Sequence, residues 1–475
     1  MLTIRFARLL RSTVVSIALA CLAGGCAAAP PRDYCFSPSG SDDAGDGSPA
    51  RPFQSIAKAN VLSLHPGDRV LFEAGQTFPG AFRLDSASGN AEHPIVIGSY
   101  GAGRASIDAG DEIGLSIHNA SNITVRDLVI FGAGQGRNWG AGVAFFNDLP
   151  GAVKLDNICI EDVDVSGFQF DGILVRGMSS DGSRGGFRHV RIVRCKAHHN
   201  LHTGIYVTGW WKPTATDYAN EDVTVSECEA SENAGDPDSP WESRLGSGIF
   251  IECVHGGLIE HCVARGNGRL CRGQGGGPVG IWTSIASDVV IQCNASTDNH
   301  TAGHFDGGGF CLDGGVIHSV MQYNKSENND GSGFGVYAFE GSPPTAGNVI
   351  RANSSVNDGR RNSYAGIHVW NGGAGVSDIE IDHNAITLSA PIEGQPRAVW
   401  IQGGASNVKV HDNVLTTTGR STRAIEIAAD QTDIRFQHNE YHCQFPAGAV
   451  TRGEKTYAAS AAWEQGGESG DKVAR

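Results

Sequence analysis

The fold is decided by two stretches that lie 33 residues apart, Val190-Arg191-Ile192-Val193-Arg194-Cys195 and Val223-Thr224-Val225-Ser226-Glu227-Cys228. In each, apolar and polar residues alternate, as in a strand with one buried face, and the run ends on a small side chain. The same frame recurs from residue 113 onward, at spacings of 26 to 35 residues. Aligned on its last position, it gives a column of eleven residues: Leu128, Val163, Cys195, Cys228, Cys262, Asn294, Asn324, Asn353, Asn384, Asn413 and Asn439.

A second short strand follows in the repeats and has the form Gly-apolar-x-apolar, as in Gly204-Ile205-Tyr206-Val207 and Gly280-Ile281-Trp282-Thr283. Short strands, glycine turns and the lack of helical periodicity predict an all-β protein, a single-stranded parallel β-helix of about eleven turns. In such a coil the column stacks inside at ~4.8 Å per turn. Its asparagines are then expected to hydrogen-bond to one another along the coil.

The sequence on either side of the repeats has other patterns. Five apolar residues at helical spacing predict an N-terminal amphipathic helix that caps the open apolar end of the coil: Phe53, Ile56, Ala57, Val61 and Leu64. The predicted regions are therefore an N-terminal cap with the first coils at 26–112, β-helix repeats at 113–450 and a C-terminal tail at 451–475.

The first residues have the pattern of an export signal. Three arginines precede an apolar run, which predicts a signal peptide over residues 1–25. The stretch Leu22-Ala23-Gly24-Gly25-Cys26 resembles a bacterial lipobox, so Cys26 is the predicted lipid anchor of an outer-membrane or cell-surface lipoprotein. Ordinary secretion, to the periplasm or the medium, is the alternative, because Ala23 stands where leucine is usual.

The charge of the mature chain limits its partners. The signal holds three of the 36 Lys and Arg residues and none of the 51 Asp and Glu residues, which leaves 33 cations against 51 anions, or −18. A surface this acidic repels nucleic acid and anionic lipid. We therefore expect no nucleic-acid partner and no membrane contact except through the lipid anchor. We also expect a monomer.

Several short motifs resemble a known family. Ser37-Pro38-Ser39-Gly40-Ser41-Asp42, Pro52-Phe53-Gln54-Ser55-Ile56 and Pro66-Gly67-Asp68 are similar to the opening of secreted right-handed parallel β-helix proteins. With the repeats, they make the chain resemble the pectin-lyase-like superfamily. The resemblance implies a right-handed coil and a polysaccharide or oligosaccharide ligand. It does not fix the reaction, because such folds carry lyases, glycoside hydrolases, epimerases and noncatalytic adhesins.

A local block strengthens the link to glycan breakdown. Residues 306–315, Asp306-Gly307-Gly308-Gly309-Phe310-Cys311-Leu312-Asp313-Gly314-Gly315, are similar to a block of bacterial β-helix proteins assigned to that activity. In those proteins an Asp is common at the place of Cys311, so this chain lacks one outward carboxylate there.

The twelve cysteines raise the question of disulfides. Cys195, Cys228 and Cys262 fall in the inward column, where parallel Cβ vectors rarely suit a disulfide, and they are interpreted as small core residues. Cys253 and Cys271 flank a loop-rich turn and are the best candidates for a bridge. No Cys or His spacing indicates zinc.

Strand alternation places a strip of rings on the outside of the second strands. Exposed aromatic side chains in a line stack on sugar faces, which predicts a glycan groove. The alternative is that long loops fold over the strip and bury its rings. The predicted substrate-binding residues are Tyr206, Trp210, Trp211, Trp282, His304, Tyr337, His368, Trp370 and Trp400.

Three carboxylates accompany this strip and are the catalytic candidates: Asp313, Asp306 and Glu252. Glycosidic cleavage needs one protonated and one ionised carboxyl, and neighbouring acids separate their pKa values in that way. The most favoured function is an exported glycoside hydrolase that requires no cofactor. The alternative for Asp306 and Asp313 is that they only bond turn amides, as Asp beside Gly often does.

Two other functions remain open. A polysaccharide lyase of the pectate-lyase type would need a base and Ca²⁺, which Glu252, Asp306 and Asp313 could hold. Cations are scarce along the strip, where only Arg176 and Lys212 are near. A noncatalytic glycan-binding or surface protein is the third candidate, and the missing acid at Cys311 is its best support.

Overall fold

The computed structural model describes residues 30–211, 217–239, 245–391, 394–429, 431–447, 449–457 and 472–473. The chain divides into two units, Met1–Pro30 and Pro31–Arg475, and all of the described strands belong to the second. The predicted signal peptide, the lipid-anchor residue Cys26 and Lys212 lie outside the described residues. In the part of the chain that is described, no helix is long and apolar enough to cross a membrane.

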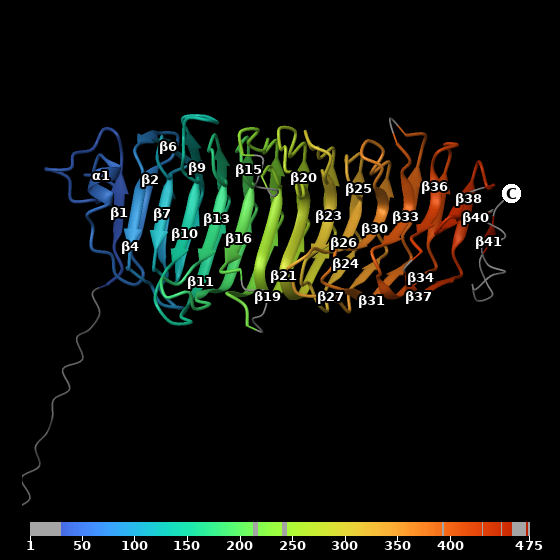
Figure 1. Ribbon diagram of the computed structural model, residues 1–475. Coiled ribbons are helices and arrows are strands. Elements are labelled where there is room, and N and C mark those ends of the chain that lie inside the picture. Colours follow the sequence, from blue (N-terminus) through green and yellow to red (C-terminus); the bar gives the residue numbers. More distant parts are fainter. Residues whose placement is uncertain are drawn as a thin grey trace, which may run out of the picture. The chain divides into compact units, whose positions relative to one another are not determined.

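The second unit is a parallel β-helix in which the chain winds around an apolar interior (Figure 1). A representative turn has three strands: β16 (Ile205–Gly209), β17 (Asn220–Ser226) and β18 (Glu229–Ser231). Each pairs in parallel with the equivalent strand of the turns before and after it. Stacking these turns produces three long faces, which we call faces A, B and C. The predicted fold is confirmed, and regular pairing begins at β1, within the region predicted to hold the cap and the first coils.

Face A includes β16 and the strands β4 (Phe82–Asp85), β7 (Leu115–His118), β10 (Val143–Asn147), β13 (Ile173–Gly177), β19 (Ile249–Glu260), β21 (Val279–Gln292), β23 (Gly308–Asp313), β26 (Phe334–Ala338), β30 (Ala365–Asn371), β33 (Arg397–Gln402), β36 (Arg423–Ile427) and β39 (Val450–Arg452). The long strands β19 and β21 continue from face A into face B, so the two faces form one hydrogen-bonded sheet. The antiparallel strand β40 (Lys455–Tyr457) ends face A.

Face B includes β17 and the strands β1 (Asp33–Phe36), β2 (Arg69–Glu73), β5 (Ile95–Tyr100), β8 (Ile123–Arg126), β11 (Lys154–Glu161), β14 (Gly186–Val193), β24 (Val320–Gln322), β27 (Thr345–Ala346), β28 (Val349–Arg351), β31 (Val376–Asp382), β34 (Ser406–His411) and β37 (Thr432–Gln437).

Face C is a separate sheet that includes β18 and the short strands β3 (Thr77–Pro79), β6 (Ala105–Gly110), β9 (Leu128–Gly132), β12 (Asp164–Ser166), β15 (Lys196–His198), β20 (Val263–Arg265), β22 (Ala295–Thr297), β25 (Lys325–Glu327), β29 (Ser354–Val356), β32 (Ala385–Leu388), β35 (Val414–Thr417), β38 (Glu440–Cys443) and β41 (Lys472–Val473). The eleven predicted turns correspond to β9 through β38, and β3 and β6 precede them.

The predicted column lies inside the coil. All eleven of its residues are buried, and its asparagines form a continuous ladder from Asn294 to Asn439. In that ladder the Nδ2 of one asparagine donates to the Oδ1 of the next, as from Asn294 to Asn324 at 3.0 Å and from Asn413 to Asn439 at 2.9 Å. The ladder satisfies amides that would otherwise be costly to bury.

A second buried ladder runs through asparagines that lie five residues after the column. It connects Asn200, Asn233, Asn267, Asn299 and Asn329 by amide hydrogen bonds of 2.8 to 3.1 Å. Its last member is Asp358, whose carboxylate accepts from Asn329 Nδ2 at 2.8 Å and from Ser355 Oγ at 2.6 Å. Burial raises the pKa of Asp358 to about 6.

The predicted capping helix is only one turn long. Helix α1 (Ile56–Ala59) begins after the N-cap Ser55, whose side chain accepts from the Lys58 N–H, and ends at Asn60. Ile56 and Ala59 are buried, whereas Val61 is 73% exposed. Phe53 and Leu64 of the predicted pattern are also buried, but they lie outside the helix, in the segments before and after it.

The predicted disulfide between Cys253 and Cys271 is also wrong, since both residues are described and no bridge joins them. Cys253 is a buried thiol whose Sγ lies 3.6 Å from the carbonyl oxygen of Trp210 on the preceding turn. Burial raises its pKa to a value above the usual range of a thiol. The side chain therefore serves as a small core residue.

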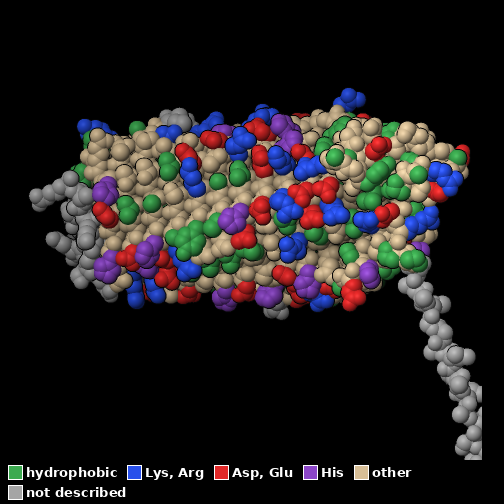
Figure 2. Space-filling view, turned by 180° about the vertical axis from the view of Figure 1, so that it is seen from behind, with side chains coloured by type: hydrophobic (Ala, Val, Ile, Leu, Met, Phe, Trp, Pro, Cys, Tyr) green, Lys and Arg blue, Asp and Glu red, His purple; other side chains and the backbone are tan. Residues whose placement is uncertain are grey.

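The outer surface of the coil carries both signs of charge. Cross-turn pairs such as Arg188–Asp156 at 2.7 Å and Arg194–Asp162 at 2.7 Å join neighbouring strands. On the side opposite to that of Figure 1, Lys and Arg, Asp and Glu, and His side chains are interleaved (Figure 2). Charges of one sign do not gather into a single large patch on the side shown.

Candidate functional site

The outward residues of face A form two parallel rows, in the register that the sequence predicts. Cross-strand pairing aligns Glu252 with Ser284, Ser284 with Asp313, and Asp313 with Tyr337. Two residues earlier, the same strands align the second row: Tyr206, Phe250, Trp282, Cys311, Gly335, His368 and Trp400. Carboxylates and rings from seven successive turns are thereby brought to one surface.

A cavity of about 860 Å³ opens over these rows between β19 and β33. Loops from both edges of face A wall it in, with residues 275–277, 304–306 and 362–364 on one edge and residues 339–340 on the other. Of the predicted site residues, nine line it: Glu252, Asp306, Asp313, Trp282, His304, Tyr337, His368, Trp370 and Trp400. This volume suits a small oligosaccharide or the end of a chain.

The rings are buried to a larger extent than the strand alternation predicts. Tyr206, Phe250 and Trp282 stack on one another, with centroid distances of 4.9 and 3.6 Å, and all three are buried. This part of the strip follows the alternative interpretation, in which rings form a satellite cluster. Alternation defines which side of the sheet a ring occupies, but not what covers it.

Three predicted substrate-binding residues do not line the cavity. Tyr206 is the first ring of the buried stack. Trp210 donates from Nε1 to the carbonyl oxygen of Ser179 at 2.9 Å, and Trp211 is 44% exposed on a loop. Tyr206 has a different task, because its hydroxyl donates to Glu252 Oε2 at 2.7 Å. Thr208 donates to the same oxygen at 2.7 Å, so Glu252 is fixed by two hydroxyls.

Gly335 interrupts the row of rings and thereby makes room for Tyr337. A Cβ at Gly335 would lie 2.7 Å from Tyr337 Cζ, so the tyrosine ring folds back over the glycine. The Tyr337 hydroxyl is 2.7 Å from Ser332 Oγ and 3.2 Å from His368 Nδ1. The ring of His368 also stacks on Trp400 at 4.4 Å.

His368 is a neutral hydrogen-bonding group. Burial, with a smaller contribution from the charge of Arg397, lowers its pKa to about 3. Its Nε2 lies 3.0 Å from Gln402 Nε2, and because an amide nitrogen only donates, this Nε2 accepts and the ring proton is on Nδ1. His368 therefore donates to Tyr337, and neither side chain is a base for catalysis.

Asp306 enters the cavity from a loop with a left-handed backbone, at φ +50. Its Oδ2 accepts from the N–H of Gly277 at 2.7 Å, and its own N–H donates to the Tyr364 hydroxyl at 3.0 Å. A Cβ at Gly277 would lie 2.1 Å from the carbonyl oxygen of Phe305, so glycine is needed for this approach of two loops. Burial raises the pKa of Asp306 to about 6, against the lowering effect of these hydrogen bonds.

Asp313 is the last residue of β23 and is partly buried at the cavity floor. Its pKa is raised to about 7. Burial is the largest cause, and the negative charges of Asp306 and, more weakly, Glu252 raise it as well. The alternative that these residues only bond turn amides holds in part, because Asp306 accepts from Gly277 on another loop and the Gly314 N–H lowers the pKa of Asp313, but burial outweighs these hydrogen bonds. Two carboxyls with raised and unequal pKa values thus share one cavity.

Among the described residues, Arg397 is the lysine or arginine that lines the cavity, and it is already paired. The guanidinium of Arg397 donates to Glu426 at 2.9 and 3.0 Å and lies 4.1 Å from the centroid of Trp400. Within the described residues, the side chains of Glu252, Asp306 and Asp313 do not form a group with donor atoms inside 4.8 Å. These three residues therefore do not fit a shared Ca²⁺ in this arrangement.

Comparisons with known proteins agree with the architecture. The family described as the right handed beta helix region matches residues 160–386. The chain has the right-handed parallel β-helix fold. No curated protein sequence matches it.

Solved structures share this β-helix at low identity. The GH136 lacto-N-biosidase from Eubacterium ramulus has a TM-score of 0.60 and 18% identity, over 87% of this chain and 68% of that one. The A-module of the Azotobacter vinelandii mannuronan C-5 epimerase AlgE4 has a TM-score of 0.54 and 16% identity, over 78% and 91%. The Dettilon tailspike protein gp208 has a TM-score of 0.50 and 15% identity, over 79% and 63%. At these identities the likeness concerns the fold alone.

Sequence reasoning missed the residues that loops bring to the cavity. Tyr364 and Phe339 line it from loops and have no common spacing with the strip, and Arg397 lines it from the start of β33. The only available signal was that insertions gather between the column residue and the second strand. That signal marks an edge of the coil and does not identify which loop side chains turn inward.

Proposed function

We propose that this β-helix protein is a glycan-active enzyme, a glycoside hydrolase that uses Asp306 and Asp313 as its carboxyl pair. The observation that carries the proposal is the pair itself, with pKa values of about 6 and about 7 inside a ring-lined cavity. Between these values one carboxyl is ionised while the other keeps its proton. Hydrolysis of a glycosidic bond by two acids requires that state.

The roles within the pair follow from the pKa values. Asp313 has the higher pKa and is the general acid, which gives its proton to the oxygen of the leaving sugar. Asp306 ionises first and acts as base or nucleophile, held by the Gly277 N–H. Glu252, fixed by Tyr206 and Thr208, adds negative charge that keeps Asp313 protonated. No metal or organic cofactor enters these steps.

The cavity walls are suited to a sugar. Trp282, Trp370 and Trp400 offer apolar ring surface, while Gln402, Glu340 and Asn362 offer hydrogen-bond partners. Among the named structural neighbours, one is a lacto-N-biosidase and another a mannuronan epimerase, which supports a glycan as the substrate. Lyase chemistry finds less support in the described part of the chain, because the lining cation Arg397 is bound to Glu426 and the carboxylates do not converge on a common ion.

The test is product analysis on a panel of neutral and uronic glycans, with and without a chelator. The proposal predicts new reducing ends that persist with the chelator, and no ultraviolet absorbance from unsaturated uronates. Unsaturated ends that disappear with the chelator would establish a Ca²⁺-dependent lyase instead. Saturable binding without any product would establish a noncatalytic glycan-binding protein.

A further inference from the structure

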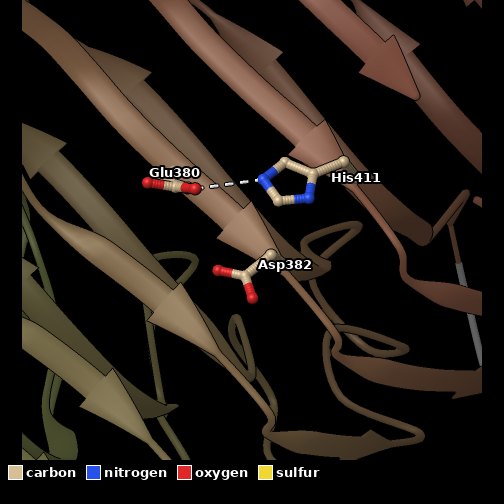
Figure 3. A group of neighbouring side chains, drawn as sticks. All are labelled: Glu380, Asp382 and His411. Carbon is tan, nitrogen blue, oxygen red and sulfur yellow. Dashed lines mark hydrogen bonds and ion pairs between the residues drawn. The ribbon is translucent and has the colours of Figure 1, made fainter. Parts of the chain in front are cut away.

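A second group of polar side chains lies on face B, away from the cavity. Glu380 and Asp382 are alternate residues of β31, so both point outward, and His411 on β34 is the register partner of Asp382. One donor atom from each of the three lies within 4.8 Å of the other two. Figure 3 shows the two carboxylates and the imidazole grouped across the adjacent strands. The group therefore joins two successive turns of the coil.

The distances and donor types suit a small divalent metal ion. A tetrahedral Zn²⁺ with bonds of ~2.0 to 2.2 Å needs donor atoms about 3.4 Å apart. His411 Nε2 and Glu380 Oε1 are 3.1 Å apart. One imidazole nitrogen with two carboxylate oxygens is a set that Zn²⁺ and similar transition metals accept, whereas Ca²⁺ and Mg²⁺ prefer oxygen alone.

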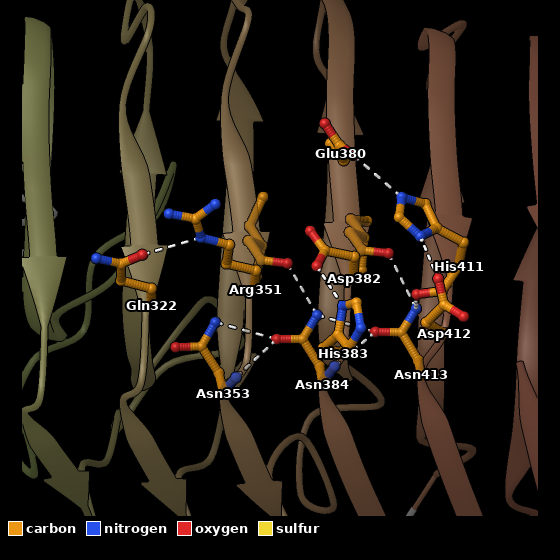
Figure 4. Close-up of polar contacts among 12 residues, drawn as sticks. Gln322, Arg351, Asn353, Glu380, Asp382, His383, Asn384, His411, Asp412 and Asn413 are labelled. Carbon is orange, nitrogen blue, oxygen red and sulfur yellow. Dashed lines mark hydrogen bonds and ion pairs between the residues drawn. The ribbon is translucent and has the colours of Figure 1, made fainter.

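A further carboxylate orients the histidine. The other ring nitrogen of His411, Nδ1, lies 2.8 Å from Asp412 Oδ2, so the ring is held between Asp412 and Glu380 (Figure 4). Metal-binding histidines almost always have such a partner on the second nitrogen, because it fixes the orientation and the tautomer of the ring. Asp382 is positioned similarly, since His383 Nδ1 lies 2.6 Å from its Oδ1.

Lysine and arginine side chains lie near the two carboxylates, and Lys409 is the register partner of Glu380. Among the residues that the structure describes, neither Glu380 nor Asp382 forms an ion pair with a lysine or an arginine. Arg351, the register neighbour of Asp382, instead donates to Gln322 Oε1 at 2.9 Å. Both carboxylates thus remain available to an ion.

A groove gives access to the group. Its volume is about 340 Å³, and Glu380, His411, Lys409 and Arg435 are among its lining residues. The side chain of Asp382 is 13% exposed, against 22% for His411 and 46% for Glu380. Asp382 therefore forms the base of the group, and Glu380 is the ligand nearest to solvent.

We propose that Glu380, Asp382 and His411 bind one divalent transition-metal ion of the Zn²⁺ type, with Asp412 as a positioning residue for His411. Three protein ligands leave one coordination position open toward the groove. Because the ligands come from β31 and β34, the ion fastens two turns near the C-terminal end of the coil. An ion that binds only the folded chain also raises its thermal stability.

The test is titration of the full chain, stripped with a chelator and then dialysed, with Co²⁺ as a spectroscopic substitute for Zn²⁺. We expect one Co²⁺ per chain, visible d–d bands without a thiolate charge-transfer band, and a higher Tm. His411→Gln and Asp382→Asn should each weaken binding at least tenfold. Asp412→Asn should weaken it about 10- to 100-fold while one ion still binds, as loss of an orienting partner does.

His442→Gln is the matched control. His442 Nε2 also lies 2.9 Å from a carboxylate, that of Glu440, but among the described residues no third donor completes a group there. Its substitution should leave the Co²⁺ affinity unchanged. Lack of saturable binding, a thiolate band from the cysteines, or equal affinity in His411→Gln would overturn the proposal. Glycan hydrolysis is a separate readout, since the group lies on another face than the cavity.

Discussion

At the scale of single residues, the pKa values of Asp306 and Asp313 determine when the pair can act. Asp306 must be ionised, which requires a pH above about 6, and Asp313 must be protonated, which requires a pH below about 7. Turnover should therefore follow a narrow bell with its maximum between these values, measured as reducing ends released across a pH series. A rate that stays level from pH 5 to pH 9 would contradict the assigned roles.

The raised pKa of Asp313 also has a consequence for stability. Its folded-state pKa of about 7 exceeds the ordinary 3.8, so the folded chain holds this proton more tightly than the unfolded chain. The associated stability is fully present below pH 3.8 and is lost as the pH rises through about 7. Asp313→Asn should therefore raise the free energy of unfolding at pH 8, by roughly 1–3 kcal/mol, and change it little at pH 4.

Thermal or denaturant unfolding of the two proteins at both pH values measures this difference. A variant that is less stable than the original protein at pH 8 would identify Asp313 as a turn residue whose carboxylate the fold needs. Such a result would leave the cavity without its proposed acid.

At the scale of elements, the buried ladder that ends at Asp358 makes a similar prediction inside the coil. Burial raises the pKa of Asp358 to about 6, so stability from its protonated form is lost as the pH rises from about 4 to above 6. Asp358→Asn keeps an amide oxygen for Asn329 and removes the buried charge. The difference in free energy of unfolding between the variant and the original protein should be about 2–3 kcal/mol more favourable to the variant at pH 8 than at pH 4. Denaturant unfolding of both proteins measures it.

The exposed Asp43 provides the control for that measurement. Asp43→Asn replaces a carboxylate that stays in water in both states, so its pH dependence should match that of the original protein. A loss of stability in Asp358→Asn at pH 8 would mean that the ladder needs an ionised end.

The strands and the loops differ in how well they can be predicted from the sequence. Alternation with a period of two fixes which side chains of β21 and β23 point outward, so Trp282 and Asp313 could be placed before the structure was known. The burial of Trp282 against the ring of Phe250 could not be predicted in this way, because it depends on contacts between turns. Gly277 and Tyr364 reach Asp306 from loops without a repeating pattern, and such loops are shaped by the turns they connect.

At the scale of the whole molecule, export and anchoring are predictions that depend on the first residues alone. We propose that the chain is exported and that Cys26 carries the lipid. Cys26→Ser should then move the protein from the membrane fraction to the soluble fraction, because a stable anchor depends on the acyl chains. The purified variant should keep its hydrolase activity, since the cavity belongs to the coil. Equal membrane retention of both forms would favour an unlipidated protein held by other contacts.

The proposed hydrolase is tested most directly by the turnover of Asp313→Asn on the glycan that the original protein cleaves best. Rates are measured as reducing ends at a pH between 6 and 7, where the pair is in its active state. The general-acid role predicts a loss of roughly 10²-fold or more in turnover with the fold retained, because an outward side chain contributes little to the core. Asp306→Asn should behave alike. Full activity in Asp313→Asn would contradict the account and would move the chemistry to Glu252 or away from the cavity.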